Sequence, residues 1–335
     1  MNVVKRIFNG SRAGQQLAAN IYKRGNRGGS VPHSTETKHL TLLLAHANGF
    51  HKELWEPTLQ RLLECEGQGW IIDQAIAFDG YNHGDSALLN RESIEGEEIS
   101  PWYLNARDIV SIVGQLDRNP NSNVVGIGHS WGASSLLLAE IMSPLTFGAL
   151  IITDPVLFAE PNNNSKVREL TMRRRSEWPD IDAAKKYFEP HPFFGAWDKR
   201  ILDLHIKYGL ETVRDAVSGE KKLVLKCRPA NEGAVYSGSY HASPHAAHGL
   251  WKVQCPTAFL TGEHSHLASA DHIKGLIEQI PDVQHMVMKD TGHLLVLERP
   301  DQTADHYVTL LDALAPKLVA TNTMQRPSTP SSASL

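Results

Sequence analysis

Residues 123–138 read NVVGIGHSWGASSLLL. The apolar run at 123–127 predicts a buried β-strand, and the Ala- and Leu-rich run after Gly132 predicts a helix. Between them, Gly128 and Gly132 permit the close backbone approach and the strained turn of a nucleophile elbow. Such a turn lifts the hydroxyl of Ser130 above the sheet, beside a helix N-terminus. Ser130 is therefore the first candidate for a catalytic nucleophile.

Short apolar runs alternate with helical patterns along most of the chain. Strands are predicted at residues 40–45, 71–78, 123–127, 149–153, 257–260 and 283–288. Apolar residues recur at helical spacing from Ile109 to Leu116 and between Asp301 and Leu314. This alternation predicts an α/β fold whose mostly parallel sheet is flanked by helices. Two weaker runs, at residues 3–8 and 17–22, predict an antiparallel pair leading into the sheet.

The alternation breaks between residues 156 and 252, where helix-like pieces near 181–188 and 200–208 accompany many aromatic side chains. We expect a single domain over residues 1–315, with a helical lid inserted at about 156–252. Most lid aromatics should pack the lid onto the sheet, and the remainder, including Trp178, should line a substrate pocket. Residues 316–335 are rich in Thr, Ser, Pro and Asn, which predicts a disordered tail.

Composition narrows the class of partner and the compartment. The 335 residues include 33 basic and 37 acidic side chains without a long basic block, so nucleic acid is not an expected partner. Three cysteines are too few for a disulfide scaffold and indicate a reducing, intracellular compartment. No run is long enough for a membrane span. The final tripeptide Ala333-Ser334-Leu335 half matches the Ser-Lys-Leu peroxisomal signal, so peroxisome and cytosol both stay open.

A serine nucleophile needs an imidazole base and a carboxylate that orients it. His293 follows the last predicted strand through a glycine turn, which is where the base of such folds lies. The usual acid loop, after residues 257–260, contains no aspartate but offers Glu263. Asp154 stands at the end of the strand after the nucleophile strand, at the edge where open α/β sheets build their sites. We favour Asp154 as the acid and keep Glu263 as the alternative.

An oxyanion hole requires two backbone N–H groups directed at the developing charge. Trp131, directly after the nucleophile, supplies the first. The second is expected from the loop after residues 40–45, with Asn48 as the preferred donor and Ala47 as the alternative. His46 and Phe50 of the same loop are candidate substrate contacts. The next loop, at residues 79–86, is expected only to shape the site.

Two further clusters of polar residues are weaker candidates for a functional site. One cluster contains the histidines His241, His245, His248, His264 and His266. These histidines do not show the H-E-x-x-H spacing of a zinc site, so neither a metal nor a cofactor is predicted. The run Arg173-Arg174-Arg175 either clamps a phosphate group or forms a solvated helix face, and we favour the second interpretation.

Several phrases together are distinctive: HANGFHKELW at 46–55, the elbow, TDPV at 153–156, SEWP at 176–179 and KYGL at 207–210. They resemble fungal peroxisomal α/β-hydrolases, a group with peroxisomal lipases, hydrolases of toxin biosynthesis and the acyl-CoA hydrolase of mycophenolic acid biosynthesis. The resemblance covers residues 40–315. It departs at the C-terminal tripeptide and at Trp131, where many relatives carry Met or Phe and where a bulkier pocket floor is expected.

The resemblance implies an α/β-hydrolase fold and an acid at Asp154. It also implies a serine hydrolase that forms an acyl-enzyme from a small ester or acyl-CoA thioester, in lipid or toxin-like secondary metabolism. A homodimer is compatible with this family. Two other interpretations stay open because a fold does not dictate a function: a ligand-binding protein, and a non-hydrolytic enzyme such as a lyase or cyclase.

Overall fold

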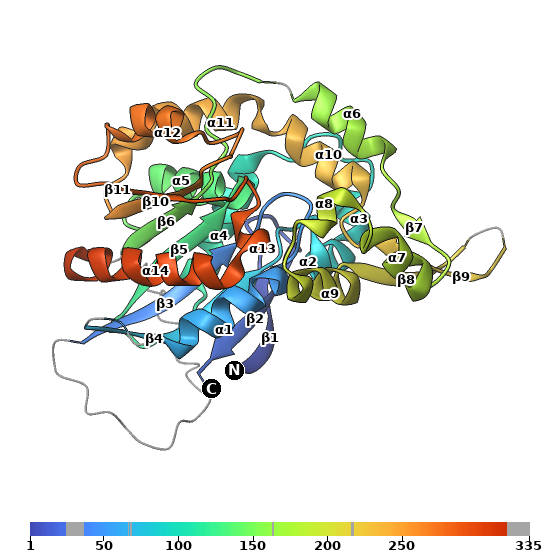
Figure 1. Cartoon of the computed structure of the whole chain (residues 1–335), viewed down its shortest axis with the longest axis horizontal. Coiled ribbons are helices and arrows are strands. Elements are labelled where there is room, and N and C mark those ends of the chain that lie inside the picture. Colours follow the sequence, from blue (N-terminus) through green and yellow to red (C-terminus); the bar gives the residue numbers. More distant parts are fainter. Residues whose placement is uncertain (25–36, 66, 68, 163, 216–217, 320–335) are drawn as a thin grey trace, which may run out of the picture.

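An eight-stranded sheet forms the centre of the protein (Figure 1). The structure is a computed structural model that describes residues 1–319 except 25–36, 66, 68, 163, 216 and 217. The strands lie in the order β1-β2-β4-β3-β5-β6-β10-β11, and β2 pairs antiparallel with β1 and β4 while all other neighbours are parallel. Their bounds are β1 Asn2–Asn9, β2 Gln16–Lys23, β3 Lys38–Ala45, β4 Trp70–Phe78, β5 Ser122–His129, β6 Ala149–Thr153, β10 Thr257–Gly262 and β11 Gln284–Met288.

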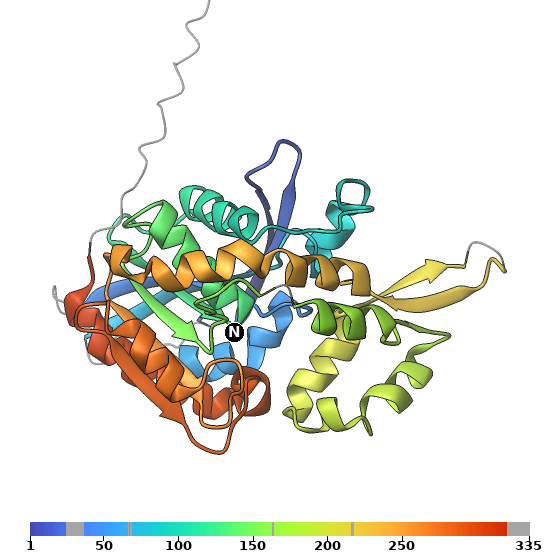
Figure 2. The same ribbon diagram turned by 90° about the horizontal axis from the view of Figure 1, so that it is seen from above.

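Helices cover both faces of this sheet. Figures 1 and 2 show α1 (Glu56–Glu64) and α14 (Pro300–Leu314) on one side, with α4 (Trp102–Gly114) and α5 (Trp131–Met142) on the other. β3 contributes side chains to the core on both faces of the sheet, because successive side chains of a strand point to opposite faces. Leu43 packs with the α4 and α5 residues, whereas Leu42 and Leu44 pack with those of α1 and α14. The predicted mostly parallel α/β fold is confirmed.

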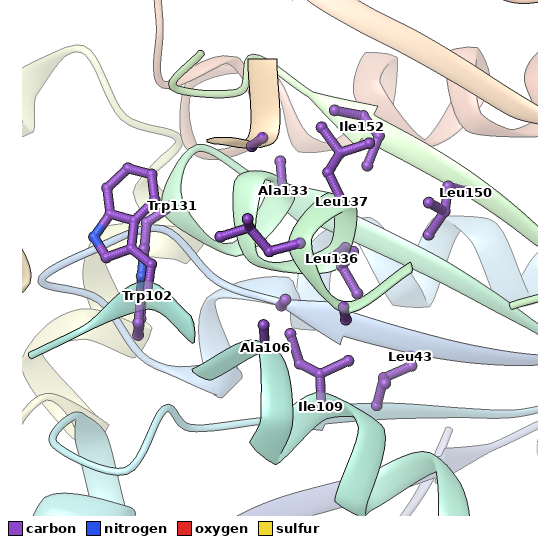
Figure 3. Packing of buried hydrophobic residues seen from close by; sticks show 14 of the residues in the cluster. Leu43, Trp102, Ala106, Ile109, Trp131, Ala133, Leu136, Leu137, Leu150 and Ile152 are labelled. Carbon is purple, nitrogen blue, oxygen red and sulfur yellow. The ribbon is translucent and has the colours of Figure 1, made fainter. Parts of the chain in front are cut away.

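The layer around α5 holds the turn at Ser130 in place. Figure 3 shows Leu136 and Leu137 of α5 between the sheet residues Leu150 and Ile152 and the α4 residue Ile109. All of these side chains are fully buried. Because α5 starts directly after Ser130, its packing also fixes the position of the serine.

The remaining short elements connect these layers. They are the 3-10 helices η1 Lys52–Trp55, η2 Leu250–Lys252 and η3 Ala315–Lys317, and the helices α2 Gly84–Leu89, α3 Arg91–Ile94, α12 Ala270–Ile277 and α13 Leu295–Glu298. The predicted antiparallel pair at the N-terminus is present as β1 and β2.

A long insertion separates β6 from β10. Its middle part lies at one side of the sheet in Figure 1, whereas its last helix, residues 239–248, packs against α5. Its elements are α6 Ser165–Arg173, β7 Glu177–Trp178, α7 Ile181–Phe188, α8 Pro192–Gly195, α9 Lys199–Tyr208, β8 Leu210–Arg214, β9 Lys221–Leu225, α10 Pro229–Ser237 and α11 Ser239–His248. The two helices expected there correspond to α7 and α9. The three-stranded antiparallel sheet in the order β7-β9-β8 was not predicted.

The described chain ends against the core. Val319 packs on the α5 side of the sheet, and its N–H donates to the Gly148 carbonyl at 3.3 Å. Of the expected tail, Leu318 and Val319 are thus partly buried against the core, whereas Pro316 and Lys317 are exposed. Residues 320–335, with Ala333-Ser334-Leu335, lie outside the described residues. In the part of the chain that the structure describes, no helix combines the length and the apolar character needed to cross a membrane.

Candidate active site

Ser130 occupies the sharp turn between β5 and α5. Its φ of 55° and ψ of −119° lie outside the regions that side-chain-bearing residues normally adopt. The two glycines make this turn possible. A Cβ on Gly128 would lie 2.6 Å from the Cα of Ala133, and one on Gly132 would collide with the backbone carbonyl of Ala45. The turn thus requires glycine at both positions.

Ser130, His293 and Asp154 form one hydrogen-bonded chain. The Ser130 hydroxyl lies 2.9 Å from Nε2 of His293, and Nδ1 of that imidazole lies 2.6 Å from Oδ1 of Asp154. Asp154 is fully buried, and Ser130 is 6% exposed. With the Nδ1 proton donated to the carboxylate, Nε2 presents its lone pair to the serine hydroxyl. The structure therefore brings together the three residues that the sequence suggested.

Asp154, and not Glu263, faces the imidazole. Asp154 follows β6 with φ 42°, and its carboxylate also accepts the Gly262 N–H at 2.8 Å and the Ser265 hydroxyl at 2.6 Å. Glu263 instead accepts the backbone N–H of Asp290 at 3.0 Å. Ser265 was missed by the sequence analysis, although it stands in the loop searched for the acid. Donors to the carboxylate stabilise its charged form, which the imidazolium needs.

His129 is a second missed residue. It precedes the serine, and its Nε2–H donates to the backbone carbonyl of His293 at 2.8 Å. Burial, together with the nearby His293, lowers the pKa of His129 to about 3. The ring is therefore neutral at ordinary pH, with a single N–H available for this carbonyl.

The predicted oxyanion loop lies beside the elbow. Trp131 is the first residue of α5, and the first N–H groups of a helix have no partner within it. A Cβ on Gly132 would also lie 2.6 Å from the carbonyl oxygen of His46, so loop and elbow are in close contact. The Gly49 N–H donates to Nε2 of His83 at 2.9 Å. The Asn48 side chain donates to the Glu232 carbonyl at 3.2 Å. The two candidate donor residues thus come from adjacent backbone segments.

The three candidate substrate contacts have different surroundings. His46 uses both ring nitrogens on backbone groups, Nδ1 on the Ala47 carbonyl at 2.8 Å and Nε2 on the Gly80 N–H at 3.1 Å. Phe50 packs edge-on against Trp197 of the insertion, with ring centroids 5.2 Å apart. Trp178 is buried in the insertion's own core with Tyr187 and Phe188, so it is neither the pocket residue expected from the sequence nor a contact between the insertion and the sheet.

A small pocket lies between the oxyanion loop and the loop of the base. It is lined by His46, Ala47, Phe50, Leu54, Trp55, His129, Val296 and Leu297. Its volume of about 10 Å³ is the space of roughly one water molecule. An acyl chain does not fit there in this arrangement. Trp131 is not among the residues that line this pocket. Its indole is buried and stacks on His83.

A buried ion network ties the oxyanion loop to its neighbours. The Lys52 ammonium lies 2.8 Å from carboxylate oxygens of both Asp79 and Glu53, and 2.7 Å from Asp85. Burial alone would lower the pKa of Lys52, but the three carboxylates outweigh it and raise the pKa. Lys226 of the insertion binds the other oxygen of Asp85 at 2.6 Å. These charges are paired, as buried charges must be.

Each arginine of the run 173–175 has its own protein partner. Arg173 pairs with Glu169, Arg174 with Glu232, and Arg175 lies over the Trp178 ring at 5.7 Å. Arg174 and Arg175 follow the end of α6 at Arg173, so the run is not the solvated helix face that the sequence favoured, and its contacts with protein groups do not support a phosphate clamp either.

The histidine-rich segments do not converge on one centre either. His245 contacts the Tyr103 hydroxyl at 3.1 Å, whereas His248 contacts the Ala159 carbonyl at 2.8 Å. One exposed trio of possible ligands occurs among the described residues, Glu263, His264 and Asp290, and it contains only one of the five histidines considered.

Several fungal proteins are similar in sequence to this chain. The chain is 26% identical over 310 residues to the peroxisomal membrane protein LPX1 of Saccharomyces cerevisiae, covering 85% of this chain and 78% of that protein. It is 25% identical over 219 residues to the abhydrolase domain-containing protein ACTT2-1 of Alternaria alternata, covering 56% and 83%. It is also 25% identical over 175 residues to the type I acyl-CoA thioesterase mpaH of Penicillium roqueforti, covering 50% and 39%. The resemblance to fungal hydrolases is confirmed.

Solved structures show the same fold. The crystal structure of the S. cerevisiae peroxisomal alpha-beta-hydrolase Lpx1 matches with a TM-score of 0.78 and 21% identity, covering 98% of this chain and 93% of that one. A thioesterase domain from the curacin biosynthetic pathway matches with a TM-score of 0.66 and 14% identity, covering 92% and 100%. The sequence model of the alpha/beta hydrolase family matches residues 42–306. This chain therefore belongs to the alpha/beta hydrolase family.

Proposed function

We propose that this protein is a serine hydrolase that cleaves a carboxylic ester or an acyl-CoA thioester through an acyl-enzyme. The observation that carries the proposal is the hydrogen-bonded chain from the Ser130 hydroxyl through His293 to Asp154, with links of 2.9 and 2.6 Å. A hydroxyl, an imidazole and a buried carboxylate in this order are the parts that acyl transfer to serine requires.

The reaction would proceed in two steps. Ser130 Oγ attacks the carbonyl carbon while its proton passes to Nε2 of His293, and Asp154 stabilises the imidazolium. The leaving alcohol or thiol takes that proton as its bond to the carbonyl carbon breaks. A water molecule then attacks the acyl-enzyme, giving up a proton to His293, which returns it to Ser130 as the acid leaves. Backbone N–H groups of Trp131 and Asn48 would stabilise the oxyanion in both steps.

The insertion between β6 and β10 would act as the lid. Three of its contacts reach the segment after β3: Phe50 with Trp197, the Asn48 side chain with the Glu232 carbonyl, and His51 stacked on His205. The small pocket beside His129 shows how little room this closed arrangement leaves. Substrate entry would therefore require the lid contacts to open.

The relatives bear on substrate class and compartment. One is named an acyl-CoA thioesterase and one a peroxisomal protein, which supports a thioester among the candidate substrates and the peroxisome among the candidate compartments. A role in lipid or secondary metabolism and a homodimer belong to the same proposal.

The test combines active-site labelling with product analysis. The wild-type protein, Ser130→Ala and the control Ser218→Ala, which changes an exposed serine in the β8–β9 turn, are incubated with a fluorophosphonate probe and with a panel of esters and acyl-CoAs. Ser130→Ala should abolish labelling and lower kcat by roughly 10⁴ to 10⁶, whereas Ser218→Ala should behave as wild type.

Each other outcome has a definite meaning. Equal turnover by wild type and Ser130→Ala would overturn the proposed mechanism. Labelling at Ser130 without release of an acid from any ester or thioester would favour the lyase or cyclase interpretation. The absence of both labelling and turnover would favour a ligand-binding protein.

A further inference from the structure

The loop after β4 reaches the oxyanion loop through a buried histidine. His83 is fully buried, and its Nε2 accepts the Gly49 N–H at 2.9 Å. Its Nδ1 lies 2.7 Å from Oδ1 of Asn82. Gly49 adopts φ 84°, and a Cβ there would meet the Glu232 carboxylate at 2.7 Å. The backbone at Gly49 is thus held in a narrow range of conformations, with His83 as its hydrogen-bond acceptor.

The Gly49 contact also determines the tautomer of His83. A backbone N–H can only donate, so Nε2 must carry a lone pair and Nδ1 the proton, which it donates to Asn82. Oδ1 of Asn48 is 3.1 Å from the same Nε2. The direction of a side-chain amide is assigned, whereas that of a backbone N–H is fixed, so the Gly49 contact takes precedence. His83 is therefore a neutral acceptor toward the oxyanion loop.

The ring face of His83 packs against Trp131, the residue after Ser130. Its ring stacks on the indole of Trp131, with centroids 5.0 Å apart and planes 29° from parallel. His46 packs against both rings, at 5.1 Å from His83 and 5.8 Å from Trp131. One side chain thus touches the loop of Asn48 and the residue Trp131, the two candidate sources of oxyanion donors.

Neutrality of His83 is built into its surroundings. Burial lowers its pKa well below the ordinary value, and the nearby His46, Arg174 and His51 lower it further. A charged imidazole would carry a proton on Nε2 and could no longer accept from Gly49.

We propose that His83 is a positioning residue of the oxyanion hole, which sets the distance between the Asn48 loop and Trp131 by accepting the Gly49 N–H and stacking on the indole. This inference rests on the proposed serine hydrolase function. An oxyanion hole acts through donors that are held in place before the charge develops. A small displacement of these donors therefore reduces stabilisation of the transition state more than binding of the substrate. The effect should thus fall on kcat and leave KM largely unchanged.

Two substitutions distinguish the role of the Nε2 acceptor of His83 from the role of its aromatic ring. His83→Phe keeps an aromatic ring against Trp131 but removes the acceptor, whereas His83→Gln offers an amide oxygen to Gly49. We expect His83→Phe to lower kcat by roughly 10- to 100-fold, less than the loss of a whole oxyanion donor, with KM within about threefold of wild type. His83→Gln should recover a substantial part of that loss.

A control variant removes a different hydrogen-bonded histidine, which is only partly buried, whereas His83 is fully buried. His285→Phe breaks a 2.9 Å contact with the Thr261 hydroxyl on β10, outside the site. It should leave kcat close to wild type. Thermal melts of all variants identify any that fail to fold. If His83→Phe is among them, the comparison of His83→Gln with wild type tests the proposal, because a purely structural role would not lower kcat while leaving KM unchanged.

The rate of fluorophosphonate labelling at Ser130 distinguishes this proposal from the proposed function. If the wild type is not labelled and turns over no ester, the hydrolase function itself fails. If the wild type is labelled and His83→Phe matches it in labelling rate and kcat, the positioning role alone is overturned. The same conclusion follows if His83→Phe and His83→Gln lose kcat equally, or if KM changes in place of kcat.

Discussion

Ser130 and Asp154 both adopt positive φ angles, 55° and 42°. Such conformations cost on the order of 1–3 kcal/mol each in residues with a side chain. Surrounding contacts compensate this strain: the Ser130 N–H donates to the Thr153 carbonyl at 2.9 Å, and the Asp154 N–H to the Leu260 carbonyl at 2.8 Å. Both reactive side chains are therefore fixed by backbone hydrogen bonds between neighbouring strands.

His129 offers a test of how the base is held. His129→Leu removes the donor to the His293 carbonyl and should lower kcat about 10-fold, because a misplaced imidazole loses alignment with the serine. His129→Gln can still donate from its amide and should stay closer to wild type. Steady-state kinetics of both variants provide the measurement, with thermal melts to compare their stability. Identical losses in the two variants would contradict a role for this hydrogen bond.

The residues that sequence predicts well are those with a fixed place along the chain. Ser130 stands between two required glycines, and His293 and Asp154 follow the ends of predicted strands. His129, Ser265 and His83 act through partners far away in sequence, such as the contact between His129 and His293, 164 positions apart. The G-x-S-x-G motif accepts any residue at position 129, so the motif does not indicate that this side chain contacts the His293 carbonyl.

At the scale of elements, strands with continuous apolar runs were predicted within a few residues. β6 was predicted at residues 149–153 and spans Ala149–Thr153, because it is buried on both faces and reads as unbroken hydrophobic sequence. The small sheet of the insertion escaped prediction for the opposite reason. β7 has two residues, and β9 begins with Lys221 and Lys222 on an exposed surface. Their pairing depends on tertiary context more than on periodicity.

The link between the insertion and the sheet domain is testable at Lys226. Lys226→Ala removes the bond to Asp85, which keeps its bond to Lys52. A charge-assisted hydrogen bond of about 1–2 kcal/mol would be lost, raising the population of opened insertion roughly 5- to 30-fold. Limited proteolysis with thermolysin, which does not cleave after lysine, should therefore cut residues 156–252 faster.

Lys222→Ala is the matched control for this experiment. Both carboxylate partners of Lys222, Glu177 and Asp215, lie within the insertion itself. Its cleavage rate should stay close to wild type. Equal acceleration by Lys222→Ala and Lys226→Ala would show that Lys226 has no special role in joining the two parts.

For the whole molecule, buried histidines determine how stability responds to mild acid. Burial lowers the pKa of four of them, His46, His83, His129 and His205. The unfolded chain binds protons at these sites below about pH 6.5 while the native state does not, so they lower stability as pH falls. Glu140 and Asp108, whose pKa values burial raises to about 7 and about 6, act in the opposite direction.

His205 is suited to a test of this effect because, among the described residues, its Nδ1 has no hydrogen-bond partner and aromatic rings surround it. These rings are Phe50, His51, Phe188, Phe194 and Trp197. His205→Phe should therefore fit the site. It should gain about 1.4 kcal/mol of stability over wild type between pH 7.5 and 5.5, the contribution of one proton bound only by the unfolded chain. Urea unfolding at the two pH values measures the difference, and a gap that does not change with pH would contradict the prediction.

The contact between Gly80 and Trp131 couples these two positions. A Cβ on Gly80 would lie 2.7 Å from Cη2 of the buried indole, so a larger residue at position 80 would force the indole or the loop after β4 to shift. Substitutions at the two positions should therefore be non-additive in their effect on the free energy of unfolding.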